Sequence, residues 1–175
     1  MKLILQKIVS GGQTGVDRGA LRAAFDLGLA HGGWCPRGRL AEDGVIPFEF
    51  QLQETESAQY HVRTRQNVIH SDGTLIIHRG PLTGGTALTQ RFALLEGRPC
   101  LLVDLDQPVD KESIVTWLQE RRIAILNVAG PRERTCPGIE SDARQLLMEA
   151  LNHKRQAIQP VLLTQELSGH KERRA

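Results

Sequence analysis

Aromatic residues make up only 4% of the 175-residue sequence, and its three cysteines include no pair at CxxC spacing. Proteins that bind single-stranded nucleic acid stack the bases on aromatic side chains, so this scarcity argues against nucleic acid as a partner. Three cysteines without such spacing support neither a disulfide framework nor a zinc site. No apolar run approaches the 18 residues of a membrane-spanning helix, so we expect no membrane partner.

The sequence also lacks a secretory signal pattern and carries a net charge of only +2. Its first residues become polar too soon for the apolar core of a signal peptide, so we expect a cytoplasmic protein. Residues 151–175 contain five basic and two acidic residues, a charge of +3, whereas the preceding 150 residues sum to −1. A chain of this length forms one domain. We assign residues 1–155 to that domain and residues 156–175 to a partly disordered C-terminal tail.

The sequence has no GxxxxGK[ST] motif of P-loop proteins and no GxGxxG motif of dinucleotide-binding folds. Instead, the apolar pair Ile8-Val9 leads into SGGQTG, which we call the first glycine loop (residues 10–15). The spacing of Leu21, Ala24 and Phe25 predicts an amphipathic helix directly after it. A glycine loop before a helix N-terminus exposes backbone N–H groups and favours anions, although a tight turn without a ligand is the alternative.

The same order of strand, glycine loop and helix occurs a second time, around the second glycine loop (residues 79–86). The apolar run at residues 74–78 predicts a buried strand, and the spacing of Leu88, Phe92 and Leu95 predicts the helix. In a parallel sheet, both loops would lie at the carboxyl edge, where such folds bind their ligands.

Strands and helices alternate along the chain, including a predicted strand at residues 123–128 that leads into an arginine-bearing loop at residues 129–134. This alternation predicts an α/β fold with an open, mostly parallel sheet and helices on both faces. Arginines beside glycine loops suit bidentate contacts with phosphate, so we predict a site for a small anionic ligand. The polar candidates at this rim are Gln13, Thr14, Asp17, Arg18, Arg37, Thr83, Thr86 and Arg132.

Metal binding has weaker support. Asp104 and Asp106 end a predicted strand and offer oxygen ligands for Mg²⁺, but a solvated turn is the favoured interpretation. The histidines are not spaced as metal ligands, so we predict no side chain bound directly to a metal. The irregular segment at residues 37–56 carries the adjacent carboxylates Glu42 and Asp43, and a loop of this length is commonly functional or mobile.

The sequence resembles the molybdenum carrier protein family of the SLOG group, Rossmann-like domains that include YpsA-related proteins. The similar blocks are SGGQTGVDRGAL, GWCPRGRLAEDG, Arg63-Thr64 in a predicted helix, SDGTLII, TGGT and NVAGPR, and they extend to about residue 152. The resemblance implies a Rossmann-like fold that binds molybdenum cofactor, a pterin carrying a phosphate. It also implies a homo-oligomer, a dimer or tetramer, with molybdoenzymes as partners. The binding residues implied by the resemblance are Gly11, Gly12, Gln13, Thr14, Gly15, Arg18, Gly84, Gly85 and Thr86.

Another SLOG branch, the phosphoribohydrolases, carries the motif PGGxGTxxE. In this sequence Leu82 and Thr83 replace the glycine pair, and Thr89 stands where the motif has glutamate. The carboxylate that would stabilise a ribosyl cation or activate water is therefore missing. A non-catalytic carrier is the favoured function. The alternatives are a nucleotide sensor and a nucleotide-processing hydrolase that would use Glu42 or Asp43.

Overall fold

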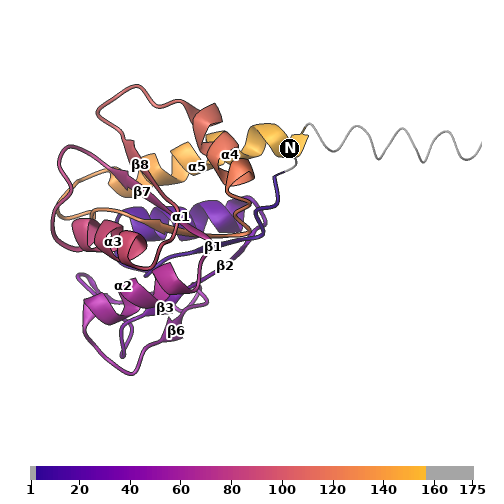
Figure 1. Ribbon diagram of the computed structural model, residues 1–175. Coiled ribbons are helices and arrows are strands. Elements are labelled where there is room, and N and C mark those ends of the chain that lie inside the picture. Colours follow the sequence, from indigo (N-terminus) through magenta and orange to yellow (C-terminus); the bar gives the residue numbers. More distant parts are fainter. Residues whose placement is uncertain (1–2, 157–175) are drawn as a thin grey trace, which may run out of the picture.

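The computed structural model describes residues 3–156, which form an α/β fold (Figure 1). The strands are β1 (Lys7–Val9), β2 (Ala30–Gly32), β3 (Trp34–Cys35), β4 (Leu40–Ala41), β5 (Gly44–Val45), β6 (Gln53–Glu54), β7 (Gly73–His78), β8 (Cys100–Asp104) and β9 (Ile125–Ala129). The helices are α1 (Val16–Asp26), α2 (Tyr60–Ile69), α3 (Gly84–Leu95), α4 (Lys111–Glu120) and α5 (Ile139–Gln156). No described helix is long and apolar enough to cross a membrane. Beyond residue 156, the predicted tail lies outside the described residues.

The central sheet has five parallel strands in the order β2-β1-β9-β7-β8. The predicted Rossmann-like α/β fold is therefore confirmed. If β9 is counted as the first strand, the order reads 3-2-1-4-5, which is the order of a doubly wound nucleotide-binding sheet. In such a sheet the direction of winding reverses beside the first strand, here between β9 and β7. The crevice at that reversal is the usual ligand site.

Helices α1, α4 and α5 cover one face of the sheet and bury the main core. Strand residues such as Ile8, Leu75 and Leu126 are fully buried beneath them. Each such side chain stabilises the fold by about 2 kcal/mol relative to exposure. Figure 1 shows α4 and α5 on one side of the sheet and α2 on the other, where α2 packs against α3. Helices thus lie on both faces, as predicted.

The spacing had predicted that Phe25 lies on the buried face of α1, but this residue is 73% exposed. Helix α1 instead buries the small residues Ala20, Ala23 and Ala24, and it packs closely on α5. A Cβ atom on Gly19 would lie only 2.3 Å from the carbonyl oxygen of Glu140. This close helix contact fixes the rotation of α1 and leaves Phe25 outside it.

Helix α2 is held mainly by polar contacts, since its buried residues are Thr64, Asn67 and Val68. The Asn67 side chain accepts a hydrogen bond from the backbone N–H of Trp34 at 2.8 Å and donates one to its carbonyl at 2.9 Å. Arg98 also donates to a carbonyl at the end of α2, at 2.9 Å. The buried face of α2 therefore carries polar side chains, those of Thr64 and Asn67, beside the apolar Val68.

Strands β4 and β5 form a small antiparallel hairpin whose turn consists of Glu42 and Asp43. The buried Arg39 side chain holds the following segment, because its guanidinium donates hydrogen bonds to the carbonyls of residues 46, 47, 50 and 52. The segment predicted as an irregular loop is therefore ordered around one arginine, and it packs on the first glycine loop.

Candidate functional site

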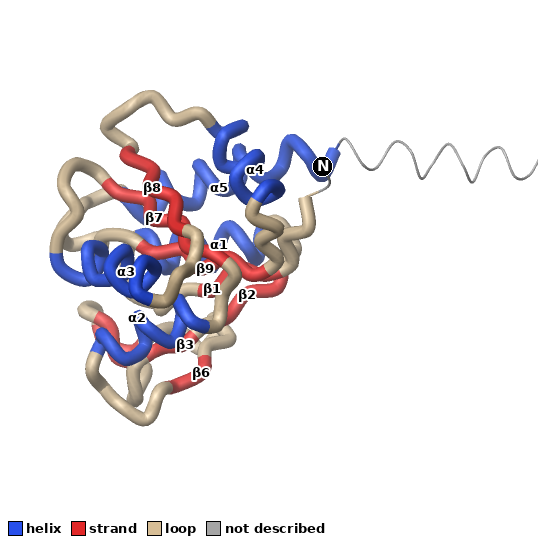
Figure 2. The backbone as a smooth tube through the Cα atoms, in the orientation of Figure 1, coloured by secondary structure: helices blue, strands red, loops and turns tan. Residues whose placement is uncertain are grey.

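A cavity of about 580 Å³ lies at the carboxyl end of the sheet, within the size range of small-molecule sites. The loops after β7 and β9 form two of its walls, and the first turns of α2 and α3 form the others. In Figure 2 the two loops, drawn in tan, lie at the end of the sheet where α3 begins. The cavity therefore occupies the reversal between β9 and β7, as expected for this strand order.

The second glycine loop opens directly into this cavity. Gly84 and Gly85 form the first turn of α3, and a Cβ atom on either would meet no atom within 4 Å. The N–H groups of Thr86 and Ala87 donate to the carbonyl of Thr83. Those of Gly84 and Gly85 have no hydrogen-bond partner among the described residues. The helix N-terminus thus presents free donors and a positive dipole end to an open space.

Three arginines, Arg63, Arg79 and Arg132, line the cavity together with one carboxylate, that of Asp17. Arg79 and Arg132 are also paired with carboxylates outside the cavity wall. Arg132 stacks on the Tyr60 ring, with its guanidinium carbon 4.9 Å from the ring centroid. Such an arginine is already oriented when a ligand arrives. The described residues of the cavity wall therefore favour an anionic ligand.

Arg79 is fixed from outside the cavity. It donates to Asp142 and Asp106 at 2.8 and 2.9 Å, and these hydrogen bonds raise its pKa further above the usual value. Asp104 is engaged as well, because its carboxylate accepts the N–H of Asp106 at 3.0 Å. The two aspartates thus form hydrogen bonds to the turn and to its arginine, and the described residues contain no cluster of three or more potential metal ligands.

Gln13 and Asp17, each only 3% exposed, are the most buried polar residues that line the cavity, and we call the part that they form with Arg63 its deep end. The carboxylate of Asp17 accepts the backbone N–H of Gln13 at 3.2 Å and Nη1 of Arg63 at 3.1 Å. Burial raises the pKa of Asp17, and the charge of Arg63 opposes this rise. Perturbed carboxyl groups in clefts are often functional. The amide Nε2 of Gln13 and Nε of Arg63 are buried without a hydrogen-bond partner among the described residues.

His78 and Cys136 also line the cavity. Nδ1 of His78 lies 2.8 Å from the carbonyl oxygen of Gly80, so this nitrogen is the hydrogen-bond donor. Burial raises the pKa of the Cys136 thiol, which is consequently protonated at neutral pH. The Cys136 thiol therefore carries no negative charge that would repel an anion.

The first glycine loop differs, because atoms of the protein already occupy the space beside its glycines. A Cβ atom on Gly11 would lie 1.7 Å from Nη1 of Arg63, and one on Gly12 would lie 2.4 Å from Leu52. At Gly15, with φ +79°, it would lie 2.4 Å from the carbonyl oxygen of Pro131. These glycines allow other segments of the chain to approach the loop.

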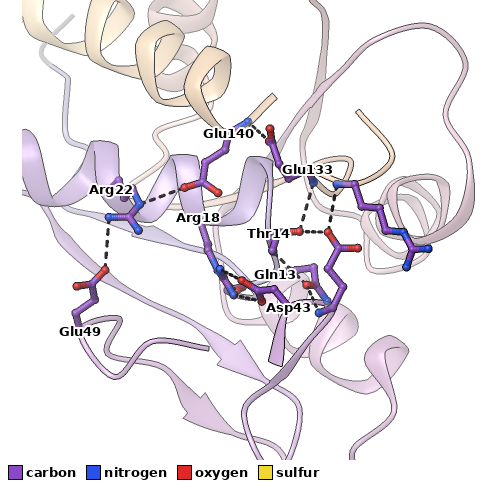
Figure 3. A network of polar contacts seen from close by, with 11 residues as sticks. Gln13, Thr14, Arg18, Arg22, Asp43, Glu49, Glu133 and Glu140 are labelled. Atoms are coloured by element: carbon purple, nitrogen blue, oxygen red, sulfur yellow. Dashed lines mark hydrogen bonds and ion pairs between the residues drawn. The ribbon is translucent and has the colours of Figure 1, made fainter. Parts of the chain in front are cut away.

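The β4–β5 hairpin closes over the same loop (Figure 3). Arg18 forms two hydrogen bonds with Asp43, at 2.6 and 2.7 Å, and the Thr14 hydroxyl donates to Glu42. The Arg18 pair lowers the pKa of Asp43. Glu42 also accepts the backbone N–H of Arg134 at 3.3 Å. Both carboxylates proposed for a hydrolase are thus bound to the protein itself.

Comparison with known proteins supports this description. A model of the circularly permutated YpsA SLOG family matches residues 8–151. This chain belongs to that family. It is similar to a crystal structure described as "Putative molybdenum carrier protein" from Syntrophus aciditrophicus, with 46% sequence identity and a TM-score of 0.83. The match covers 86% of this chain and 98% of that chain. A search of curated proteins found no match.

The permutation in the family's name is visible in the strand order. Strand β9, which comes last in the chain, occupies the central position that the first strand holds in an unpermuted sheet. The loop after β9 therefore takes the place of the usual first phosphate loop. At Gly130 in this loop, a Cβ atom would lie 2.2 Å from the carbonyl oxygen of Ile77, so the loop after β9 lies directly against the end of β7 beside the cavity.

Only some of the predicted site residues lie together in the cavity of this SLOG domain. The predicted residues that line the cavity are Gln13, Asp17, Thr83, Gly84, Gly85, Thr86 and Arg132. Those that do not line it are Gly11, Gly12, Thr14, Gly15, Arg18 and Arg37. The sequence-based candidates omitted Tyr60, Arg63 and Arg79. The polar surface of the predicted helix containing Tyr60 and Arg63 was the available signal for this wall.

Proposed function

We propose that this SLOG domain binds a phosphorylated heterocyclic ligand in the cavity and acts as its carrier, with molybdenum cofactor as the leading candidate. The observation that carries the proposal is the open N-terminus of α3, where Gly84 and Gly85 offer unpartnered N–H groups to the cavity. A helix N-terminus with glycines and nearby arginines is a common phosphate site. The name of the similar crystal structure supports a molybdenum-related ligand.

The cavity residues fit the two chemical parts of such a ligand. Gly84, Gly85 and Arg132 would hold the phosphate, while the deep end at Asp17 and Gln13 would take the heterocycle. The cofactor supplies the redox chemistry of its metal, which its pterin holds. The protein binds the phosphate, orients the pterin and excludes water from it. We further propose a cytoplasmic homo-oligomer that delivers its ligand to molybdoenzymes.

Calorimetric titration tests this function with molybdenum cofactor and a panel of nucleoside monophosphates. Gly85→Glu places a carboxylate at the phosphate end, and Gly85→Gln is the matched neutral control. We expect Gly85→Glu to weaken binding roughly 100-fold relative to Gly85→Gln, because like charges meet there. Native mass spectrometry of the purified protein checks for a retained ligand. A wild-type protein that binds no phosphorylated heterocycle would refute the proposal.

A nucleotide hydrolase or a nucleotide sensor is the second candidate, favoured by the buried carboxylate of Asp17 in the cavity. Thr89 stands where the hydrolase motif has glutamate, and its hydroxyl donates to the carbonyl of Gly85 at 2.9 Å. Asp17, rather than Glu42 or Asp43, is the carboxylate in position to act. Release of free base from a nucleotide, abolished in Asp17→Asn, would establish hydrolysis. Binding without base release would favour the carrier or the sensor.

A further inference from the structure

We propose that the deep end of the cavity recognises a 2-amino-4-oxopyrimidine edge, the edge that guanine shares with pterins, through the side chains of Gln13 and Asp17. The inference rests on the proposed function, because it concerns the heterocycle of a ligand whose phosphate lies at α3. It narrows the ligand class to guanine nucleotides and pterin phosphates and excludes adenine nucleotides.

The orientation of the Gln13 amide is fixed by its neighbours. Its Oε1 atom accepts the backbone N–H groups of Thr14 at 3.1 Å and Glu42 at 2.9 Å. Two donors identify this atom as oxygen, so the other terminal atom is the NH₂ group. This nitrogen is buried and has no partner among the described residues, although Gln13 is only 3% exposed and lines the cavity. Gln13 therefore contributes an unused donor.

Asp17 contributes the complementary acceptor. Both hydrogen bonds that it accepts from Gln13 and Arg63 end on Oδ2. The nearby Ser10 hydroxyl donates to the carbonyl of Val128 at 2.6 Å, and a contact from Ser10 also lowers the pKa of Asp17. A carboxylate has about four lone pairs, so Asp17, which lines the cavity, retains acceptor capacity on Oδ1 beside these contacts. Arg63 stabilises the negative charge, and its buried Nε is a further unused donor.

A donor beside a carboxylate matches one kind of heterocycle edge. Guanine and pterins present a carbonyl, a ring N–H and an amino group in a row, so the carbonyl faces Gln13 and both donors face Asp17. Adenine presents an amino group in place of the carbonyl and lacks the ring N–H. Its amino group would meet the Gln13 donor, and the Asp17 acceptor would lose its partner. Buried groups left unpaired in this way strongly discriminate between ligands.

The test is calorimetric titration of the wild-type protein with GMP, IMP, XMP and AMP. We expect GMP to bind at least about 100-fold more tightly than AMP. IMP lacks the amino group and should bind about 10-fold more weakly than GMP. XMP presents a carbonyl to Asp17 and should bind more weakly than IMP.

Equal affinities for GMP and AMP would overturn the inference but would leave the proposed phosphate site intact. Failure of all four nucleotides and of molybdenum cofactor to bind would overturn the proposed function as well.

Two variants assign the preference to the named side chains. Asp17→Asn replaces part of the acceptor by a donor, so the preference should shift from GMP toward XMP. Gln13→Glu keeps the acceptor for the two backbone N–H groups but removes the donor, so GMP should lose its advantage over AMP. Gly85→Glu is the control and should weaken all four nucleotides by a similar factor. Thermal melting checks that each variant folds. If Asp17→Asn does not fold, the affinities of Gln13→Glu alone test the assignment. An unchanged order of affinities in Gln13→Glu would overturn the assignment.

Discussion

The two glycine loops share one sequence pattern, a strand followed by glycines and a helix, yet they serve opposite purposes. At the first loop, Cβ atoms on Gly11 and Gly15 would collide with Arg63 and with the carbonyl of Pro131. At the second loop, Cβ atoms on Gly84 and Gly85 would meet nothing within 4 Å. Glycine permits close approach in both places. In the first loop the approaching group belongs to the protein, and in the second we propose that it is the ligand.

The strand order explains this difference. The first loop follows β1, which is second in the winding order of the sheet, whereas the second loop follows β7 beside the central strand β9. A ligand at the reversal between β9 and β7 lies against the second loop. The first loop lies on the other side of β9, where α2 and the β4–β5 hairpin cover its glycines, and of this loop only Gln13 lines the cavity. Substitutions at the two loops can test whether the first is covered by the protein and whether the second is open to the cavity.

The largest expected effect comes from removing Arg63, the side chain that lies over Gly11. Arg63→Met keeps most of the side-chain length but leaves the buried carboxylate of Asp17 without its ion partner. We expect the free energy of unfolding to fall by about 3–5 kcal/mol, as measured by urea denaturation at neutral pH. The folded-state pKa of Asp17 is raised, so its ionisation destabilises the fold as pH rises above the ordinary value of 3.8. The loss should therefore be smaller at acid pH.

The double variant Arg63→Met/Asp17→Asn is the control for this prediction. It removes the charge that the single variant leaves buried, so it should be more stable than Arg63→Met alone. A loss below about 1 kcal/mol in the single variant would show that this contact does not hold the first loop.

Sequence patterns predicted the layers of this fold but not which glycine loop lies open to the cavity. Alternating apolar runs and helical spacing identify β7, β9 and α3 because these signals are local. The position of β9 beside β7 depends on strand pairing between distant segments, which no local pattern encodes. Arg18 illustrates the consequence. Its place beside a glycine loop predicted a phosphate ligand, whereas in the structure its guanidinium binds Asp43.

The missed wall of the cavity has a similar physical cause. Tyr60 and Arg63 lie on a helix with a weak apolar stripe, because α2 is anchored through Asn67 and backbone carbonyls rather than by a broad apolar face. Periodicity reports burial of apolar side chains and is insensitive to such anchoring. The family resemblance included Arg63 in a matching block, but only the folded chain shows that it faces Asp17.

An intermediate effect is expected from a matched pair of glycine substitutions. Gly15→Ala introduces a side chain at φ +79° and 2.4 Å from a backbone oxygen, so we expect a loss of about 3 kcal/mol from backbone strain and overpacking. Gly85→Ala adds a methyl group to open space in a helix and should increase stability by about 0.5–1 kcal/mol. Urea denaturation of both variants measures the contrast. Equal losses at the two positions would remove the distinction between a covered loop and an open one.

The smallest expected effect tests the outermost contact of the covered loop, the pair between Arg18 and Asp43. The Asp43 side chain is 49% exposed, so solvent screens the pair, and Asp43→Asn should lower stability by about 0.5–1 kcal/mol at neutral pH. Because Arg18 lowers the folded-state pKa of Asp43, the stabilisation is complete above the ordinary value of 3.8 and is lost as pH falls through the lowered value. Urea denaturation at pH 7 and at about pH 3 should therefore show a difference between wild type and Asp43→Asn that shrinks on acidification.

Glu56→Gln is the control, because it changes another exposed carboxylate and should alter stability by less than about 0.5 kcal/mol. If the effect of Asp43→Asn persisted undiminished in acid, the turn of the β4–β5 hairpin would be held over the first loop by its packing rather than by charge.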